Sequence, residues 1–389
     1  MTAAASPSDP HEGSPDPEEA ARPDHVIREP DDVSPDTADE EGGAARQVDP
    51  EGRTRPMAPP GHGAERRAAL VYNPIKVDAD ALRALVTRLS AEAGWGEPAF
   101  FETTVDDLGD DVTRQALEEG ADAVLVAGGD GTVRAVSEAM NGTDVPLTIV
   151  PSGTGNLLAR NLLLPLDDPE AMVRATFEGD VHPVDVGIAR ISRASGQTEE
   201  HAFVVMAGIG LDAAMIANTS SQLKKTVGWV AYVDGAARSL PFAKPFRVMY
   251  QMDGHRLHAT RAQSVLFANC GSLPAGISLV PEASISDGRL DVCIIRPAGV
   301  FGWARVWRRI WWENSVMRRS RAGQRVLARR PEDSSVRYLR GVAVETATTP
   351  PQAIQLDGDE FGEAIRMRCR IVEGGLKTVF PKGHDVSGL

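Results

Sequence analysis

The stretch Asp122-Ala-Val-Leu-Val-Ala-Gly-Gly-Asp-Gly-Thr-Val-Arg-Ala-Val-Ser-Glu-Ala-Met140 decides the fold of the first half of the chain. Its apolar run, 123–127, is typical of a buried parallel strand. A glycine turn follows, and from Thr132 the apolar residues recur at helical spacing. A strand, a glycine turn and a helix predict a phosphate cradle, because glycines let the backbone approach an anion and the first helix amides point towards it.

Asp130 is the unexpected member of this turn. An acidic side chain repels a phosphate unless a cation lies between them, so we expect Asp130 to act through Mg²⁺ or a water network. The alternative is a plain strand-to-helix turn in which the glycines serve packing only.

Two motifs carry a resemblance to a known family. Gly-Gly-Asp-Gly-Thr at 128–132 resembles the nucleotide-binding signature of diacylglycerol-type lipid kinases, NAD kinases and, more distantly, phosphofructokinases, and matches neither the Walker nor the dinucleotide pattern. Pro-Ser-Gly-Thr-Gly-Asn-Leu-Leu-Ala-Arg at 151–160 resembles the P-x-G-T-x-N-x-x-A-R segment of the bacterial diacylglycerol/sphingosine kinase-like family. NAD kinases resemble the chain only around the first motif. The resemblance covers roughly residues 66–382, with Gly155 and Leu157-Leu158 as departures.

Composition separates a tail from the folded part. Residues 1–65 contain 16 Asp/Glu and five Arg, so they carry −11 of the total charge of −14, together with 11 Pro and no aromatic residue. Such a segment cannot bury enough apolar surface to offset its ordering entropy, and we expect it to be disordered.

Residues 66–185 alternate strand patterns (66–74, 99–104, 123–127 and 146–151) with helix patterns (82–89, 106–119, 132–140 and 157–162). This alternation predicts an open parallel sheet with helices on both faces. Nucleotides bind at the carboxyl ends of such strands. The resemblance implies a three-layer α/β domain of the NAD kinase/phosphofructokinase-like type that binds ATP. It places the nucleotide near Asn73, Pro74, Thr104, Gly128, Gly129, Asp130, Gly131, Thr132, Ser152, Gly153, Thr154 and Asn156.

From residue 186 to 382 the pattern becomes β-like, with glycine and proline turns and a helical insertion at 299–330. The resemblance implies a β-rich lipid-substrate domain. It places Asp185 in a carboxylate–water network near the substrate and Asp212 against a lipid head-group hydroxyl. The alternatives are a strand-end cap for Asp185 and a helix N-cap for Asp212.

The segment 284–289, Ser-Ile-Ser-Asp-Gly-Arg, matches a family loop that holds a structural Mg²⁺. The resemblance implies the Asp287 carboxylate and the main-chain carbonyls of Ser284 and Arg289 as ligands, a set that suits a hard cation. An Asp-Gly hairpin turn without metal is the alternative, and the turn and the metal site can coexist.

The segment Leu-Asp-Gly-Asp at 356–359 resembles the family's L-D-G-E motif. The family's proton acceptor falls on Asp359, where relatives usually have Glu, so the shorter side chain must still reach the acceptor hydroxyl. Asp357 is the neighbour expected to help through metal or water. The alternative is an Asp-Gly turn between two surface strands.

Residues 303–330 contain nine Arg and one Glu, and Trp303, Trp307 and Trp311 fall on one helical face. Tryptophan with arginine suits the headgroup region of an anionic bilayer. The alternative is an amphipathic helix packed on the β-rich domain. No nucleic-acid module, signal peptide or membrane-spanning run is recognisable, so the expected location is the cytoplasmic face of the membrane.

Together these features predict a lipid kinase that uses ATP and Mg²⁺, with diacylglycerol as the default acceptor. Sphingoid, ceramide-like and glycerophospholipid acceptors stay open. The alternatives are a NAD kinase and a catalytically weak nucleotide- or lipid-binding regulator. The family forms dimers, but no dimer interface can be identified in the sequence.

Overall fold

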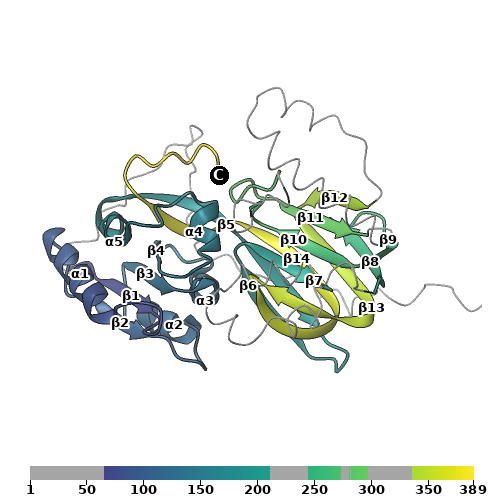
Figure 1. Cartoon of the computed structure of the whole chain (residues 1–389), viewed down its shortest axis with the longest axis horizontal. Helices are drawn as coiled ribbons and strands as arrows, with labels where there is room; N and C mark the ends of the chain where they lie inside the picture. Colours follow the sequence, from purple (N-terminus) through teal and green to yellow (C-terminus); the bar gives the residue numbers. More distant parts are fainter. Residues whose placement is uncertain (1–64, 211–243, 273–279, 281, 297–334) are drawn as a thin grey trace, which may run out of the picture. The chain divides into compact units, whose positions relative to one another are not determined.

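The computed structural model describes residues 65–210, 244–272, 280, 282–296 and 335–389 (Figure 1). Outside the described residues lie the acidic tail apart from its last residue, the candidate head-group contact Asp212, and the Trp/Arg-rich insertion 299–330. The predictions for these segments therefore stay predictions.

Four short strands form a parallel sheet in the first half of the described chain, in the order β2-β1-β3-β4 (Figure 1). Every residue of β1 and β3 is buried, as expected for parallel strands covered on both faces. The register pairs Gly128 with Pro151, so the two glycine motifs leave the sheet at the same edge. The strands are β1 (Ala68–Tyr72), β2 (Ala99–Glu102), β3 (Ala123–Gly128) and β4 (Leu147–Pro151).

Helices cover both faces of this sheet. Val86 of α1 and Val173 of α5 belong to one apolar cluster, whereas Ala116 of α2 and Val136 of α3 belong to another. Alternate residues of β1 point into the two clusters, which separates the faces. The helices are α1 (Ala79–Glu92), α2 (Asp110–Glu118), α3 (Asp130–Met140), α4 (Leu157–Asn161) and α5 (Pro169–Glu178).

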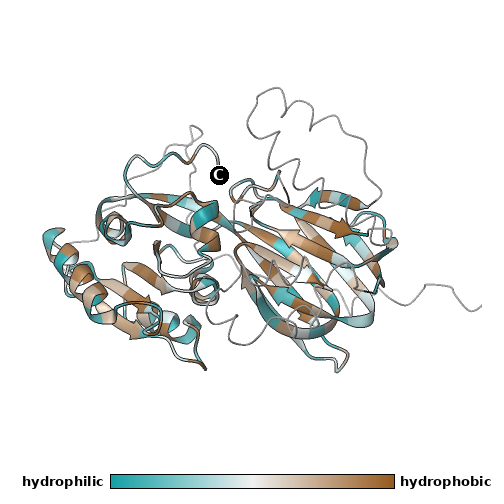
Figure 2. Ribbon diagram, viewed as in Figure 1, coloured by the Kyte–Doolittle hydropathy of each residue, from teal (hydrophilic) through white to brown (hydrophobic). Residues whose placement is uncertain are grey.

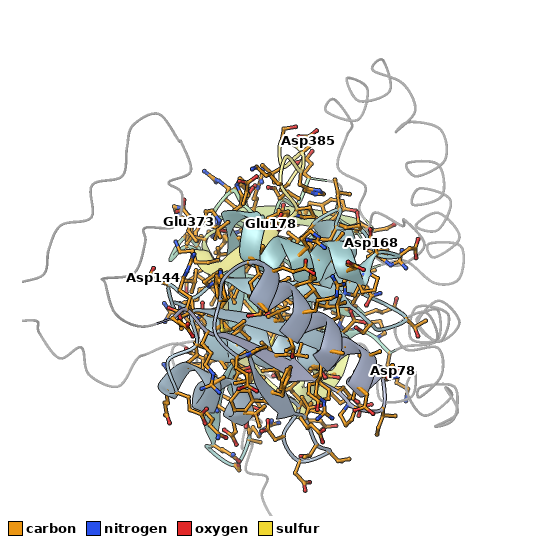
Figure 3. All side chains as sticks on the ribbon, turned by 90° about the vertical axis from the view of Figure 1, so that its left-hand side faces the viewer. Asp78, Asp144, Asp168, Glu178, Glu373 and Asp385 are labelled. Carbon is orange, nitrogen blue, oxygen red and sulfur yellow. The ribbon has the colours of Figure 1, made fainter. Side chains whose placement is uncertain are left out.

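Aspartate caps begin two of these helices. Asp78 accepts a hydrogen bond from the Ala81 amide at 3.1 Å, and Asp168 accepts one from the Ala171 amide at 2.9 Å (Figure 3). Such caps satisfy amides that have no partner within the helix. They fix where α1 and α5 start, although α5 itself was not among the elements expected from the sequence.

Two helix starts differ from the sequence prediction. The second helix begins at Asp110 instead of residue 106, because the Asp107 carboxylate caps it from outside through the Val112 amide at 3.1 Å. The third begins at Asp130 instead of Thr132, because the Val133 amide already bonds to the Gly129 carbonyl at 3.0 Å. The Gly-Asp-Gly segment is thus the first turn of the helix itself.

The rest of the described chain is predominantly β-structure, and Figure 2 shows its apolar residues along the strands. The main path, β12-β11-β10-β7-β13-β14, is antiparallel. The strands are β5 (Asp180–Ser192), β6 (Thr198–Phe203), β7 (Met206–Ile209), β8 (Phe246–Met252), β9 (His258–Ala262), β10 (Ser264–Ala268), β11 (Leu290–Ile295), β12 (Val336–Gly341), β13 (Ala343–Leu356) and β14 (Asp359–Phe380).

The long last strand, β14, joins the two sheets. It pairs with β13 near its start, with β5 along its second half, and with β4 in parallel through Thr378 and Leu147. The predicted fold class, an α/β sheet followed by a β-rich part, is confirmed. None of the described helices is long and apolar enough to cross a membrane.

Candidate active site

The first glycine loop, residues 128–132, joins β3 to α3. Gly129 is the N-cap, and no described side chain forms a capping hydrogen bond at this helix start. A Cβ atom on Gly128 would lie 2.7 Å from Cβ of Thr132, so the turn is tightly packed inside. A Cβ atom on Gly129 would meet no described residue within 4 Å. This combination of a packed interior and an open backbone face suits an anion.

The second glycine loop, residues 152–156, joins β4 to α4. The Gly153 amide donates to Asn156 Oδ1 at 2.9 Å, and Asn156 adopts the left-handed conformation with φ of 46°. Arg160 Nε donates to the Gly155 carbonyl at 2.7 Å. The asparagine and the arginine of the motif thus hold the loop from both ends, which explains why these residue types occur at this spacing.

The structure brings the two loops into contact. A Cβ atom on Gly153 would lie 3.2 Å from Cα of Gly129. Asp130 Oδ1 accepts a hydrogen bond from the Leu157 amide at 2.7 Å, and its Oδ2 lies where a Cβ atom of Gly155 would stand. Asp130 therefore holds the second loop, and glycine at 155, a departure from the family pattern, leaves room for this carboxylate.

Burial raises the pKa of the Asp130 carboxyl, although the hydrogen bond from Leu157 opposes that change. The negative charge of Asp359 also contributes to the higher pKa. Both carboxylates therefore influence the same small region. A cation between them would relieve this repulsion, as expected from the sequence for Asp130.

Asp359 lies directly above the first turn of α3. It begins β14 after the two-residue turn Asp357-Gly358, whose φ angles of 48° and 93° match a type I′ hairpin. A Cβ atom on Gly131 would lie 3.0 Å from Asp359 Oδ2. The side chain is 39% exposed, so a substrate can reach it. Gly131 of the predicted phosphate cradle and Asp359, the predicted base, are 228 residues apart in sequence. The structure places them next to each other.

A buried arginine, which sequence reasoning missed, connects these two elements. Arg134 Nε lies 3.3 Å from Asp359 Oδ2, and its Nη1 lies 3.0 Å from Glu138 Oε2. Glu138 Oε1 lies 3.3 Å from His201 Nδ1, and the Arg134 guanidinium lies 5.0 Å from the Phe361 ring. The Arg-x-x-x-Glu spacing at 134–138 was the available signal, because residues four apart share a helix face.

Asp357, predicted to help the base through metal or water, has its carboxylate beneath the β13–β14 turn. It is 4% exposed, and its carboxylate accepts hydrogen bonds from the amides of Val204, Val205 and Met206 at 2.8–2.9 Å. Burial raises its pKa to about 6, against the effect of these hydrogen bonds. The carboxylate therefore holds the 204–206 backbone beneath the hairpin, and a catalytic role stays a prediction.

Asp185, predicted near the substrate, is 2% exposed and also holds backbone. Its carboxylate accepts from the Gly288 amide at 2.7 Å and from the Gly374 amide at 2.8 Å. Burial raises the pKa of this carboxyl. These contacts tie the 284–289 loop to the bulge in β14, and the predicted substrate contact stays a prediction.

The predicted metal ligands Ser284, Asp287 and Arg289 lie in one loop before β11. Asp287 Oδ1 accepts a hydrogen bond from the Arg289 amide at 3.0 Å, and Oδ2 forms an ion pair with Arg340. The Ser284 hydroxyl donates to the Leu389 carbonyl at 2.9 Å. Within the described residues no group of three or more His, Cys, Asp or Glu side chains could hold a metal ion.

The chemistry of this loop still allows a hard cation. Asp291, 5% exposed, has a buried Oδ2 that accepts no hydrogen bond within the described part of the chain and lies 3.6 Å from Arg340 Nε. Oxygen ligands of this kind suit Mg²⁺. However, a cation at Asp287 has to compete with the Arg340 guanidinium for the carboxylate.

The remaining predicted nucleotide contacts lie on the loops that end β1, β2 and β4. The Asn73 amide donates to the Ala127 carbonyl at 2.9 Å, so this loop runs beside the end of β3. The Thr104 hydroxyl accepts from the Asp107 amide at 3.0 Å. Among the described residues, no side-chain hydrogen bond joins Asn73, Pro74 or Thr104 to the two glycine loops. Ser152 and Thr154 lie within the second loop, where the Ser152 hydroxyl donates to the Val150 carbonyl at 2.9 Å.

Comparisons with known proteins identify the family and support the fold. The profile of the diacylglycerol kinase catalytic domain matches residues 67–189, and that of the YegS C-terminal NAD kinase beta sandwich-like domain matches residues 203–380. A solved structure titled as a putative diacylglycerol kinase from Bacillus anthracis superposes with a TM-score of 0.62 at 20% identity, covering 83% of this chain and 98% of that one.

Curated relatives match over different lengths. A diacylglycerol kinase of Mycobacterium tuberculosis is 32% identical over 46% of this chain, and the match spans 56% of that relative, a little over half its length. A probable YegS-like lipid kinase of Pseudomonas fluorescens is 30% identical over 59% of this chain and 73% of its own. A diacylglycerol kinase of Bacillus subtilis is 25% identical over 82% and 97%. The chain therefore belongs to the family of diacylglycerol kinases and YegS-like lipid kinases.

Proposed function

We propose that this protein is an ATP-dependent lipid kinase that transfers the γ-phosphate to a lipid hydroxyl, with diacylglycerol as the first acceptor to test and phosphatidic acid as its product. The observation that carries the proposal is the position of Asp359, whose carboxylate lies against Gly131 in the first turn of α3. A carboxylate beside a phosphate cradle has the placement that a proton acceptor for an attacking hydroxyl needs.

The proposed reaction needs little covalent help from the protein. Amides of the 128–132 and 152–156 loops hold the phosphates of ATP. The lipid hydroxyl oxygen forms a bond to the γ-phosphorus, the bond from that phosphorus to the bridging β,γ oxygen breaks, and ADP leaves. Asp359 accepts the hydroxyl proton, and its exposed side chain lets the acceptor approach.

Bound Mg²⁺ would neutralise charge on the phosphates. Asp130 is the acidic residue placed to hold this ion, through a water or directly, with the oxygen that does not bind the Leu157 amide. For the loop before β11, Asp287 is the corresponding carboxylate, in competition with Arg340.

We further propose that the reaction takes place at the cytoplasmic surface of a membrane, because diacylglycerol is a lipid located in the bilayer. The 303–330 segment, rich in tryptophan and arginine, is the proposed contact with anionic headgroups. A homodimer is proposed from the family alone.

Phosphate transfer from labelled ATP to a panel of lipids in mixed micelles tests the function. The panel contains diacylglycerol, a sphingoid base, ceramide and a glycerophospholipid, with NAD run in parallel. Labelled lipid from the wild type, reduced at least about 100-fold in Asp359→Asn, is the expected result. The asparagine keeps the shape of the side chain and removes its ability to accept the proton.

The other outcomes discriminate between the rival functions. Label on NAD alone would replace the lipid kinase with a NAD kinase. ATP binding without transfer to any acceptor would favour the nucleotide- or lipid-binding regulator, in which aspartate at 359 has replaced a competent base.

A further inference from the structure

The Arg134 side chain lies between α3 and the β13–β14 turn with 8% of its surface exposed. A buried guanidinium is destabilising unless its donors are paired. Arg134 meets this requirement with two carboxylates, Glu138 at 3.0 Å and Asp359 at 3.3 Å, and with the Phe361 ring on which it stacks at 5.0 Å. The arginine is thus held from three directions.

Glu138 anchors this arrangement from the protein side. It accepts hydrogen bonds from the Ala202 amide at 3.1 Å and pairs with His201 at 3.3 Å. Burial alone would raise the pKa of Glu138, but the bonds from His201 and Ala202 and the charge of Arg134 hold it below the usual value. The anchor is therefore ionised at neutral pH, and it fixes the Nη1 end of Arg134.

With that end fixed, the Nε–H of Arg134 is directed at Asp359 Oδ2. The other oxygen, Oδ1, accepts no hydrogen bond within the described residues and so keeps its lone pairs for a substrate proton. Gly131 of the same helix also approaches the carboxylate, because its Cβ position is 3.0 Å from Oδ2 and 3.4 Å from Oδ1. An aspartate reaches one methylene less far than the glutamate usual in relatives, so its exact placement matters more.

We infer that Arg134 is a positioning residue for Asp359: anchored by Glu138, it holds one carboxylate oxygen so that the other faces the acceptor hydroxyl. This inference rests on the proposed function, because it assigns Arg134 a role in the same phosphoryl transfer. Arg134 does not touch substrate in this scheme and acts only through Asp359.

A double-mutant cycle with Arg134→Met and Asp359→Ala tests the inference. Methionine keeps much of the volume of the arginine stem and removes the guanidinium. The expected single-variant result is a kcat about 30- to 100-fold lower with the KM for ATP within about twofold. In the Asp359→Ala background, Arg134→Met should lower kcat by no more than about twofold, because the residue through which it acts is already gone.

Two further variants keep the test decisive if methionine impairs folding. Arg134→Lys keeps the charge but cannot bridge both carboxylates, so it should lower kcat by less than Arg134→Met does. This loss should also be absent in the Asp359→Ala background. Added guanidinium should restore part of the kcat of Arg134→Met and none of that of Asp359→Ala. Arg114→Met serves as the matched control, since Arg114 lies on the exposed side of α2, paired with Asp110 and Asp111.

The inference is overturned if the wild type is active and neither Arg134→Met nor Arg134→Lys lowers kcat. It is also overturned if the two losses of kcat multiply in the double variant, because a purely structural arginine would act independently of Asp359. An inactive wild type would overturn the proposed function and this inference together. The two failures are therefore distinguished by the wild-type turnover.

Discussion

The β13–β14 turn and the loop before β11 contain the same kind of ion pair and differ in how deeply its arginine is buried. In each, an arginine pairs with an aspartate: Arg134 with Asp359 in the turn, and Arg340 with Asp287 in the loop. The Arg134 side chain is 8% exposed and the Arg340 side chain is 37% exposed. Exposed ion pairs contribute little, whereas buried ones are strongly coupled to their surroundings. The same pairing can therefore fix a carboxylate firmly in one region and loosely in another.

The likeness extends to the backbone. Asp357 holds three amides beneath the turn, and Asp185 holds two amides that join the loop to β14. In both regions one aspartate shapes the main chain while a second presents its carboxylate to solvent. Asp357 and Asp359 belong to one short motif but have different roles, and the burial and contacts of each side chain determine its role.

The largest expected contrast between the regions is in turnover. Asp359→Ala should lower kcat at least about 100-fold, because it removes the proton acceptor. Asp287→Ala should lower it by no more than about threefold, because that carboxylate lies in a loop outside the glycine cradle. Lipid phosphorylation at saturating ATP measures both. Equal losses in the two variants would remove the distinction between a catalytic turn and a structural loop.

The next contrast is in stability. Arg134→Met removes a buried guanidinium that pairs with Glu138 and Asp359, and should lower the free energy of unfolding by about 3 kcal/mol. Arg340→Met breaks a partly exposed pair and should lower it by less than about 1 kcal/mol. Denaturant unfolding at pH 7.5 without added Mg²⁺ compares the two. Similar values would mean that exposure is not what separates these pairs.

A smaller effect concerns pH. The folded-state pKa of Asp357 is raised to about 6, above the unfolded value, so the folded protein binds the proton more tightly. Stability from this group is therefore present at low pH and lost as the pH rises through about 6. Asp357→Asn cannot titrate, so the stability advantage of wild type over the variant should grow by about 1–2 kcal/mol from pH 7.5 to pH 4.5.

Denaturant melts at several pH values measure this difference. Asp185→Asn is the matched variant from the other region, since burial also raises the pKa of Asp185. A wild-type advantage over Asp357→Asn that does not change with pH would show that the three amide bonds outweigh burial and keep the carboxylate ionised.

Much of the fold was predictable because the first half of the chain follows simple periodic rules. The apolar run 123–127 before a glycine turn is typical of a buried strand, and the structure places β3 there. Helix starts were less predictable, because they depend on contacts such as Asp107 with Val112, which capping statistics alone do not locate. The helical spacing of apolar residues specifies a helix better than its ends.

The candidate site was predictable only in part. The two glycine motifs and Asp359 could be selected from their resemblance to the family, and the structure brings them together. The Arg134–Glu138 spacing could indicate a pair on one helix face, but its contacts with His201 and Asp359 could not be predicted, since they join α3 to β6 and β14. Long-range pairing of charged residues leaves no periodic trace in a single sequence.

The smallest expected effect concerns Mg²⁺ at the loop before β11. In the wild type, Arg340 already pairs with Asp287, so replacing EDTA with millimolar Mg²⁺ should raise the melting temperature of the nucleotide-free protein by no more than about 2 °C. In Arg340→Met the carboxylate is released, and with the neighbouring Asp291 it offers a cation two acidic side chains. The rise should then be larger, and it should disappear in the Arg340→Met/Asp287→Ala double variant. If Mg²⁺ instead raises the melting temperature of the wild type strongly, and this rise is lost in Asp287→Ala, the cation displaces the Arg340 guanidinium from Asp287. The Arg340–Asp287 pair would then be weaker than the exposure of Arg340 suggests.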